Sequence, residues 1–301
     1  MDYKLQHKLK EARKFEDSGK FLHAIQIYLS LITDFPDYPE SYISLAEIYF
    51  HLGKPESGEK LLSKILKRQP GNIELRTYLA EYLIKNRQWQ KAVDLFSEFS
   101  HEEEPFASYL IGYSYFNLKD FELAKVFLLN FVISDEDPEL IHSAYLLIAQ
   151  IEMELNQFDN ALKYAKKAGK ISTESWEYQF VLAKTYFHLD MIAHSYDAVK
   201  KAVKINSNEP EIFQLAGKIS FKAKDFVNAK SYFVKYIDLK ENILPSDYIN
   251  LANVCLKSGK PDEALKYVDN ALHIDSRNKT ALAMKEKINI LLNKNLASDV
   301  Q

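Results

Sequence analysis

Eight small residues recur along the chain about every 34 positions, and this spacing limits the fold more than any other feature of the sequence. A second small residue follows each of them after 12 positions, without exception. The outer spacing varies from 32 to 37 residues while the inner offset is constant, so each unit is rigid and insertions fall between units. The first set is Ala12, Ala46, Ala80, Gly112, Ala149, Ala183, Gly217 and Ala252, and the second is Ala24, Gly58, Ala92, Ala124, Ala161, Ser195, Ala229 and Ala264.

Apolar residues around these positions fall at helical spacing, which predicts two helices in each unit. The second unit shows this with Tyr42, Leu45, Ala46 and Tyr49 on one helix face, and Gly58, Leu61, Leu62 and Ile65 on the next. Turn residues such as Gly53-Lys54-Pro55 separate the two helices, and prolines lie between units. Each small residue marks the place where two helix backbones approach closely.

The sequence therefore predicts eight antiparallel helix pairs followed by one further amphipathic helix. The predicted repeats span 5–38, 39–72, 73–104, 105–138, 142–175, 176–209, 210–243 and 245–278. We expect residues 279–295 to cap the open end with their polar face, and residues 296–301 to be frayed.

This pattern resembles the tetratricopeptide repeat family. The second repeat carries the family's pattern at Tyr42, Leu45, Ala46, Tyr49, Gly58, Leu62, Ile65 and Pro70. The resemblance covers residues 5–278 and implies an all-α, right-handed α-solenoid in which ligands lie along the inner wall formed by the first helix of each pair. It says little about which ligand is bound.

Composition excludes several function classes. A net charge of −3 argues against a nucleic-acid-binding protein. The basic stretch 163–170 is better explained as a solvated helix face than as an RNA site. A single cysteine, Cys255, cannot form a disulfide within the chain or a cysteine-built zinc site.

The sequence also predicts no membrane insertion. Residues 1–21 lack the apolar core of a secretion signal. The most apolar stretch, 126–133, is far shorter than the roughly 20 residues of a membrane-spanning helix. We therefore expect a cytoplasmic protein.

No pattern of catalytic, metal-binding or cofactor-binding residues emerges. The eight histidines form no pair at metal-ligand spacing, and phosphate-loop, dinucleotide and nucleophile motifs are absent from the sequence. Cys255 occupies a core position of its repeat and is predicted to be a small buried hydrophobe. The acidic runs 102–104 and 135–137 are interpreted as solvated loops, with a weak cation or basic-partner site as the alternative. We expect no enzymatic activity, no cofactor and no metal.

The first helices supply candidate contacts for a protein or peptide ligand. The predicted wall is acidic near repeats 2 and 3, aromatic at repeat 4, and basic at repeats 6 to 8. Its residues are Glu40, Glu47, Glu74, Glu81, Tyr78, Tyr109, Tyr113, Phe116, Lys184, Lys218, Lys222, Asn250, Asn253 and Lys257. Tyr109 and Tyr113 are the strongest candidates, whereas Phe116 occupies a position that is often aromatic in the family and packs internally.

The graded charge leads to a hypothesis about how a ligand is oriented. Residues 1–150 carry a net charge of −6 (17 basic, 23 acidic) and residues 151–301 one of +3 (22 basic, 19 acidic). An extended segment would then place its basic part near repeats 2 and 3 and its acidic part or C-terminus near repeats 7 and 8. The carboxylate clamp of chaperone-binding repeats is not predicted, because the capping helix has Thr280 and Met284 where cations belong.

The second helix of repeat 4 is apolar nearly all round, from Phe121 to Ser134. Such a helix needs cover on every side. Neighbouring repeats could supply the cover, or the helix could form a homodimer or partner surface.

Taken together, the sequence predicts a non-catalytic scaffold or adaptor that binds an extended protein segment in the groove of the solenoid. Two alternatives stay open. One is a regulatory sensor of a short signalling peptide, and the other is an assembly or targeting chaperone for a larger complex.

Overall fold

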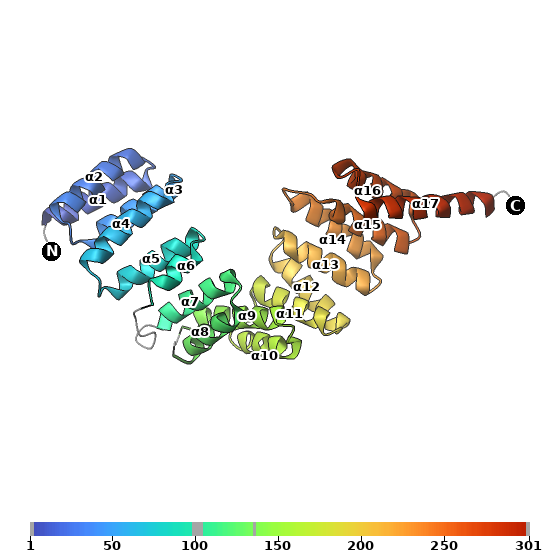
Figure 1. Cartoon of the computed structure of the whole chain (residues 1–301), viewed down its shortest axis with the longest axis horizontal. Helices are drawn as coiled ribbons and strands as arrows, with labels where there is room; N and C mark the ends of the chain where they lie inside the picture. Colours follow the sequence, from blue (N-terminus) through green and yellow to red (C-terminus); the bar gives the residue numbers. More distant parts are fainter. Residues whose placement is uncertain (1–2, 98–104, 135–136, 299–301) are drawn as a thin grey trace. The chain divides into compact units, whose positions relative to one another are not determined.

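Every secondary-structure element in the described part of the chain is a helix, and successive helices pack in pairs (Figure 1). The structure is a computed structural model that describes residues 3–97, 105–134 and 137–298. The predicted all-α fold of packed helix pairs is thereby confirmed.

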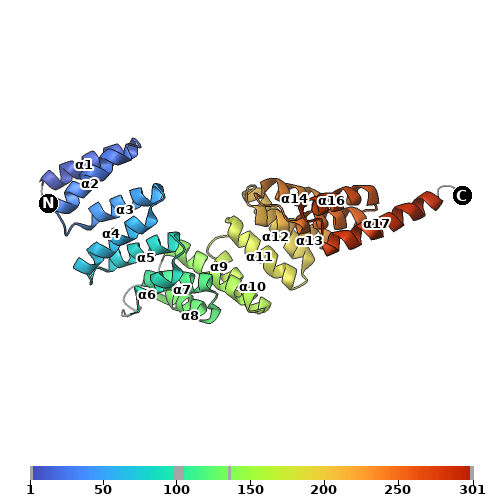
Figure 2. The ribbon, with the colours of Figure 1, turned by 45° about the horizontal axis from the view of Figure 1, so that its top comes forward.

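The chain divides into two compact units, Met1–Asp137 and Pro138–Gln301. Unit 1 contains α1 (Tyr3–Asp17), α2 (Phe21–Asp34), α3 (Pro39–His51), α4 (Pro55–Arg68), α5 (Ile73–Lys85), α6 (Trp89–Asp94), α7 (Pro105–Leu118) and α8 (Phe121–Ser134). Unit 2 contains α9 (Pro138–Glu154), α10 (Phe158–Gly169), α11 (Trp176–His188), α12 (Ile192–Ile205), α13 (Pro210–Lys222), α14 (Phe226–Leu239), α15 (Pro245–Lys257), α16 (Pro261–Ile274) and α17 (Lys279–Ser298). Within each unit the two helices of a pair lie side by side, as α1 and α2 do in both ribbon views (Figure 2).

The turn inside each pair is the same in all eight repeats. One residue adopts a left-handed conformation, with φ between 58° and 74°, and the residue after it donates a backbone hydrogen bond to a carbonyl five positions earlier, as Lys54 does to Tyr49. This is the hydrogen bond of a Schellman motif, which ends the first helix and reverses the chain. The left-handed residues are Gly19, Gly53, Arg87, Lys119, Asn156, Asp190, Lys224 and Gly259.

The recurring small residues lie where helices touch. A Cβ at Gly112 would lie 2.8 Å from Cγ of Leu128, and one at Gly217 would lie 2.7 Å from the ring of Phe233. The hydroxyl of Ser195 donates a 2.7 Å hydrogen bond to the carbonyl of Ala183, so a small polar residue also fits this contact.

Two helices, α6 and α17, differ from the predicted pattern. The second helix of repeat 3, α6, has only six residues. The acidic run 102–104 and residues 135 and 136 lie outside the described residues. The last helix, α17, continues to Ser298, so residues 296–298 of the expected frayed tail are helical.

No helix of the described chain is both long and apolar enough to span a lipid bilayer.

Candidate functional site

In unit 1, a pocket of about 800 Å³ lies between α1 and the start of α3. It is lined by Gln6, Leu9, Lys10, Arg13, Lys14, Asp17, Ser18, Tyr38 and Glu40. Glu40, a predicted wall residue, accepts hydrogen bonds from the guanidinium of Arg13 and the hydroxyl of Tyr38. Its charge is therefore compensated within the unit.

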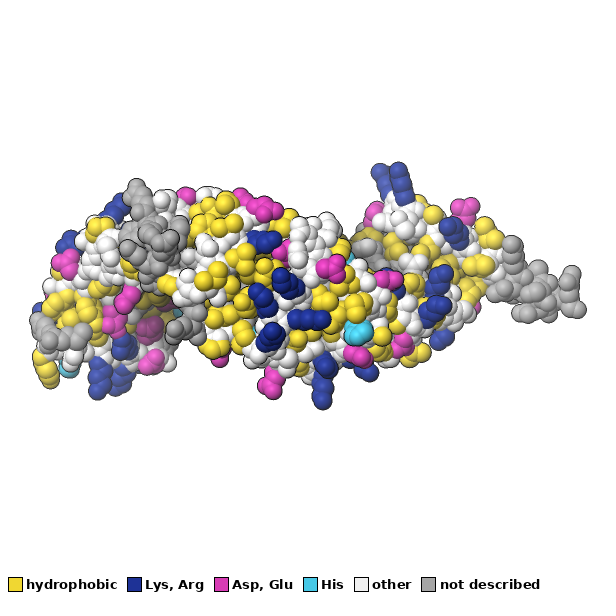
Figure 3. All heavy atoms as spheres, turned by 90° about the horizontal axis from the view of Figure 1, so that it is seen from below, with side chains coloured by type: hydrophobic (Ala, Val, Ile, Leu, Met, Phe, Trp, Pro, Cys, Tyr) yellow, Lys and Arg dark blue, Asp and Glu magenta, His cyan; other side chains and the backbone are white. Residues whose placement is uncertain are grey.

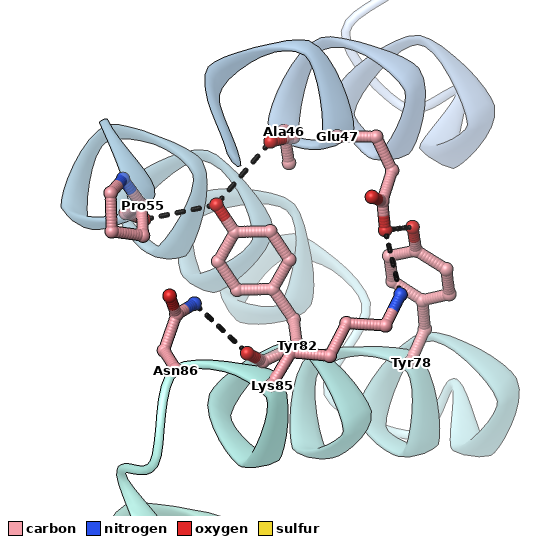
Figure 4. A network of polar contacts seen from close by, with 7 residues as sticks. All are labelled: Ala46, Glu47, Pro55, Tyr78, Tyr82, Lys85 and Asn86. Carbon is pink, nitrogen blue, oxygen red and sulfur yellow. Dashed lines mark hydrogen bonds and ion pairs between the residues drawn. The ribbon is translucent and has the colours of Figure 1, made fainter. Parts of the chain in front are cut away.

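A second polar cluster connects α3 and α5 through Glu47. Its carboxylate accepts a hydrogen bond from the Tyr78 hydroxyl and forms a 3.4 Å ion pair with Lys85 (Figure 4). Burial, the hydrogen bond to Glu47 and the negative charge of Glu47 all raise the pKa of Tyr78. Burial also raises the pKa of Glu81, and the nearby Glu47 adds to this increase while Lys85 opposes it.

Tyr82, one turn along α5 from Tyr78, fixes α5 against the preceding repeat. Its hydroxyl lies 3.0 Å from the carbonyl oxygen of Pro55 and 3.3 Å from that of Ala46 (Figure 4). Asn86 donates a 2.9 Å hydrogen bond to the carbonyl of Tyr82 at the end of the same helix. These contacts hold Glu47 and Tyr78 in a fixed relation to each other.

Aromatic rings form a row along α7. Tyr109 stacks on Phe106 and Tyr113 with ring centroids 6.0 and 6.5 Å apart, and it also contacts the buried ring of Phe131. Burial raises the pKa of Tyr109. Tyr113 in turn packs edge-on against Trp89 of α6 at 5.9 Å. Both predicted tyrosines therefore take part in internal packing while staying partly accessible.

The remaining predicted residues of unit 1 are Glu74 and Phe116. Glu74 is exposed at the start of α5. Phe116 packs against Phe121 and lies under the ammonium of Lys119, which fits the packing interpretation of this ring.

In unit 2, a pocket of about 520 Å³ joins α11, α13 and α15 and brings together four of the predicted wall residues. It is lined by Phe187, Lys218, Phe221, Lys222, Phe233, Asn250 and Asn253. We refer to it as the α11–α15 pocket.

Two kinds of polar group face this pocket. Lys222 is already engaged, because it forms a 2.6 Å ion pair with Asp190 and lies over the ring of Phe187. Lys218 is exposed and forms no ion pair within the described part of the chain. The half-buried amides of Asn250 and Asn253 likewise form no hydrogen bond with other described side chains or backbone. These three side chains are available to a ligand.

Lys184 and Lys257, also predicted wall residues, do not line the α11–α15 pocket. Lys184 pairs with Glu154 at 4.0 Å, and Lys257 is exposed at the end of α15.

Phe233 was not among the predicted residues, because it belongs to the second helix of its repeat, α14, rather than to a first helix. Its ring reaches the pocket because Gly217 has no side chain to block it. The sequence signal for this contact was Gly217, which stands at a position where most repeats have alanine.

The groups that could act as metal ligands or nucleophiles can be placed within the described residues. No group of three or more metal-ligating side chains gathers anywhere in the described chain. Cys255 is fully buried, and burial raises the pKa of its thiol to about 11, which keeps the thiol protonated near neutral pH. His142 is buried, and its ring nitrogens lie 3.0 Å from the carbonyl of Ala168 and 3.3 Å from the hydroxyl of Ser175, so it has a structural role.

On α8, the neighbouring helices cover only part of the apolar surface. Ala124, Leu128 and Phe131 are buried, whereas Val126 and Ile133 are 51% and 81% exposed. An aliphatic surface therefore remains on this helix.

Comparison with sequence families identifies tetratricopeptide repeats. Two sequence models of this repeat match, one at residues 16–82 and the other at residues 107–132 and 142–173. The TPR repeat-containing protein YpiA of Bacillus subtilis (strain 168) is 29% identical over 117 residues, which cover 38% of this chain and 27% of YpiA. The chain thus matches about a quarter of that relative's length.

Solved structures share the fold at low sequence identity. The Cut9 and Hcn1 hetero-tetramer of APC/C contains a chain with a TM-score of 0.64 and 15% identity, and the match covers 89% of this chain and 52% of that one. A tetratricopeptide repeat protein from Parabacteroides merdae has a TM-score of 0.57 and 14% identity, covering 83% of this chain and 98% of that one. YrrB, described as a TPR protein with an unusual peptide-binding site, has a TM-score of 0.53 and 17% identity over 66% of this chain and 97% of its own.

Proposed function

Because this chain is a tetratricopeptide-repeat protein, a fold that serves protein–protein interaction, we propose that it is a non-catalytic scaffold that binds an extended protein segment along its first helices. The α11–α15 pocket is the observation that carries this proposal. It supplies a lysine, two amides and an aromatic surface within one depression of unit 2.

The chemistry of the pocket favours a ligand that bears carboxylates. The ammonium of Lys218 and the amides of Asn250 and Asn253 can all donate hydrogen bonds to a carboxylate. Phe187 and Phe221 offer partly buried apolar surface next to these donors, which suits an aromatic or aliphatic side chain of the same ligand. An extended peptide that alternates acidic and apolar residues combines both properties.

The wall of unit 1 is less negative than its residues imply. Glu40 and Glu47 are neutralised by Arg13 and Lys85, which leaves Glu74 and Glu81 as the acidic groups open to a ligand. We retain the proposal that a basic part of the partner is bound by unit 1 and an acidic part by unit 2. The contribution of unit 1 should be smaller, because it rests on fewer uncompensated charges.

Binding to the α11–α15 pocket can be measured with a fluorescein-labelled peptide of alternating Glu and Phe residues, with a Lys and Phe peptide as the reversed-charge probe. We expect the variant Lys218→Ala/Asn250→Ala/Asn253→Ala to bind the Glu peptide at least about tenfold more weakly than the wild type, since hydrogen bonds to charged groups contribute about 1.5–3 kcal/mol each. Lys235→Ala/Lys266→Ala is the matched control, because both lysines are exposed on the second helices α14 and α16 and belong neither to the pocket nor to the predicted wall. Equal affinities of the wild type and the triple variant would overturn the proposal.

The sensor alternative predicts a different observable. A regulatory sensor should change its radius of gyration in small-angle X-ray scattering when the peptide is added, whereas a scaffold binds without this change. The chaperone alternative predicts that the protein leaves the complex after assembly, which co-purification from successive assembly stages can test.

A further inference from the structure

A groove of about 580 Å³ lies between the start of α11 and the end of α12, and it shares no residue with the α11–α15 pocket. It is lined by Thr173, Glu174, Tyr178, Gln179, Leu182, Lys201, Lys204 and Ile205. We call it the α11–α12 groove. None of its residues belongs to the predicted wall.

The wall of the groove formed by the loop before α11 is held in place by several contacts. The amide of Gln179 donates a 2.9 Å hydrogen bond to the carbonyl of Thr173, and the hydroxyl of Ser175 accepts one of 3.1 Å from the backbone of Tyr178. The ring of Tyr178 packs against Gly169 at the end of α10, where a Cβ would lie 2.6 Å from its Cζ atom. A surface fixed in this way loses little conformational entropy when it binds a ligand.

The charge of the groove is positive on the α12 side. Lys201 and Lys204 are exposed, stand one turn apart on the same helix, and form no ion pair within the described chain. Glu174 is the one acidic residue in the lining, and it is exposed at the opposite edge.

Further lysines lie on the helix that precedes the groove. Lys163, Lys166 and Lys170 are exposed on and just after α10, which directly precedes the loop that forms one wall of the groove. Figure 3 shows lysine and arginine side chains gathered over the part of unit 2 where α10 lies in Figure 1. The surface of α10 is therefore positively charged and attracts negatively charged partners.

The floor of the groove is apolar. Tyr178 and Leu182 are 8% and 9% exposed, and the side chain of Ile205 is about half exposed at the rim. A ligand that places aliphatic groups on this floor removes apolar surface from water. A ligand that offers only phosphate groups does not. Nucleic acid is a poorer fit, because the one aromatic ring in the lining is too buried to stack on a base and no arginine lines the groove.

We propose that the α11–α12 groove binds an extended acidic peptide segment that carries aliphatic side chains. Residues on one face of an extended peptide repeat about every 6.6 Å, which is close to the roughly 5–6 Å between helix positions three or four apart. Two carboxylates on alternate peptide residues therefore match the spacing of Lys201 and Lys204. The aliphatic side chains between them project from the opposite face of the peptide, so they reach the apolar floor of the groove when the charged face lies on the α12 side. This surface gives the protein a second binding site that is independent of the α11–α15 pocket, so that unit 2 can join two partners.

The test uses a fluorescein-labelled peptide of alternating Glu and Leu residues and fluorescence anisotropy with the full chain. The charge-reversal variant Lys201→Glu/Lys204→Glu is expected to weaken binding at least about tenfold. The control Lys235→Glu/Lys266→Glu makes the same change in net charge at two exposed lysines of α14 and α16 and should change the Kd less than about twofold. Ile205→Ser tests the apolar contact and should weaken binding several-fold without any change in charge.

The outcomes separate this proposal from the one for the α11–α15 pocket. A Kd that is unchanged in Lys201→Glu/Lys204→Glu, or an equal loss in the two charge-reversal variants, overturns the α11–α12 groove as a peptide site. So does tighter binding of a single-stranded RNA oligonucleotide than of the peptide in 200 mM salt. If the Lys218→Ala/Asn250→Ala/Asn253→Ala variant still binds the Glu and Leu peptide, this result supports the α11–α12 groove as a separate site. The conclusion does not depend on whether the α11–α15 pocket binds the Glu and Phe peptide.

Discussion

The ring of Tyr82 in α5 ends against the backbone of Gly58 in α4, and a Cβ built on Gly58 would lie 2.6 Å from the Cζ atom of Tyr82. The hydroxyl of Tyr82 lies within hydrogen-bond distance of two carbonyls of the preceding repeat. Most other repeats have alanine at the position of Gly58. The absence of a side chain at Gly58 therefore makes room for the ring of Tyr82 in the next repeat, and the helix that contains Gly58 does not itself need a glycine there.

This contact predicts that Gly58→Ala destabilises the protein although alanine is the better helix former. Overpacking of this kind costs about 1–3 kcal/mol, which exceeds the gain of about 1 kcal/mol in helix propensity. The urea midpoint should fall in Gly58→Ala and recover in Gly58→Ala/Tyr82→Leu. Gly71→Ala is the control, since nothing lies within 4 Å of a Cβ there, and an equal effect of the two single substitutions would contradict the prediction.

The left-handed turn predicts a stabilising substitution. Lys224 has φ of +62° and an exposed side chain. Because a residue with a Cβ is strained in this region and glycine is not, Lys224→Gly should raise the free energy of unfolding by about 0.5–1 kcal/mol. Lys166→Gly, within α10, should lower it by about 1 kcal/mol. Urea unfolding of both variants measures the difference, and destabilisation by Lys224→Gly would show that the turn is not strained.

The Glu47–Tyr78 contact predicts a coupling energy between the first helices of repeats 2 and 3. A double-mutant cycle of Glu47→Ala and Tyr78→Phe should give about 1–2 kcal/mol, because the bond has a charged acceptor. The Glu47–Lys85 pair should give less than about 0.5 kcal/mol, because the side chain of Lys85 is half exposed. Equal coupling energies for the Glu47–Tyr78 and Glu47–Lys85 pairs would contradict the prediction, because the hydrogen bond from the Tyr78 hydroxyl would then be no stronger than an exposed ion pair.

Alkaline pH should destabilise the protein through buried acids. Burial, the first cause in each case, raises the pKa of Cys255 to about 11 and those of Tyr28 and Tyr82 to about 12. These groups lose their protons at lower pH in the unfolded chain, so their contribution to stability is complete below about pH 8, and it is lost as the pH rises towards 12. The urea midpoint at pH 8, 10 and 11 should fall progressively and should fall less in Tyr28→Phe. A constant midpoint across this range would contradict the prediction.

The aliphatic surface of α8 predicts weak self-association. We expect sedimentation equilibrium to give a mass that rises with concentration for the wild type and stays at that of the monomer for Val126→Glu/Ile133→Glu. Leu22→Glu/Val227→Glu, at two other highly exposed aliphatic residues, is the control and should behave like the wild type. A constant wild-type mass would remove α8 as a surface for a second copy.

Much of the fold could be predicted because it depends on local pattern. Helix pairs follow from apolar spacing, and the recurring small residues locate the close contacts that Gly112 and Gly217 make in the structure. Turns at Gly19, Gly53 and Gly259 were visible in the sequence, whereas Arg87 and Lys119 take the same left-handed conformation without a glycine to signal it.

The candidate site could be predicted only in part. Lys218, Lys222, Asn250 and Asn253 were selected from their positions on first helices, and the structure brings them into one pocket. The same reasoning could not show that Glu40 and Glu47 are neutralised, because Arg13 and Lys85 lie 27 and 38 residues away in the chain.

The sequence by itself determined the repeat, its period and the two helices in each unit, because a helix needs only neighbours three or four residues apart to define its buried face. The tertiary structure decided which charges are open to a ligand and which rings line a pocket. It placed Phe233 in the α11–α15 pocket, and it joined Lys201 and Lys204 to the apolar floor of the α11–α12 groove. Those properties depend on the distance between side chains of different helices, and that distance is set by packing rather than by position in the sequence.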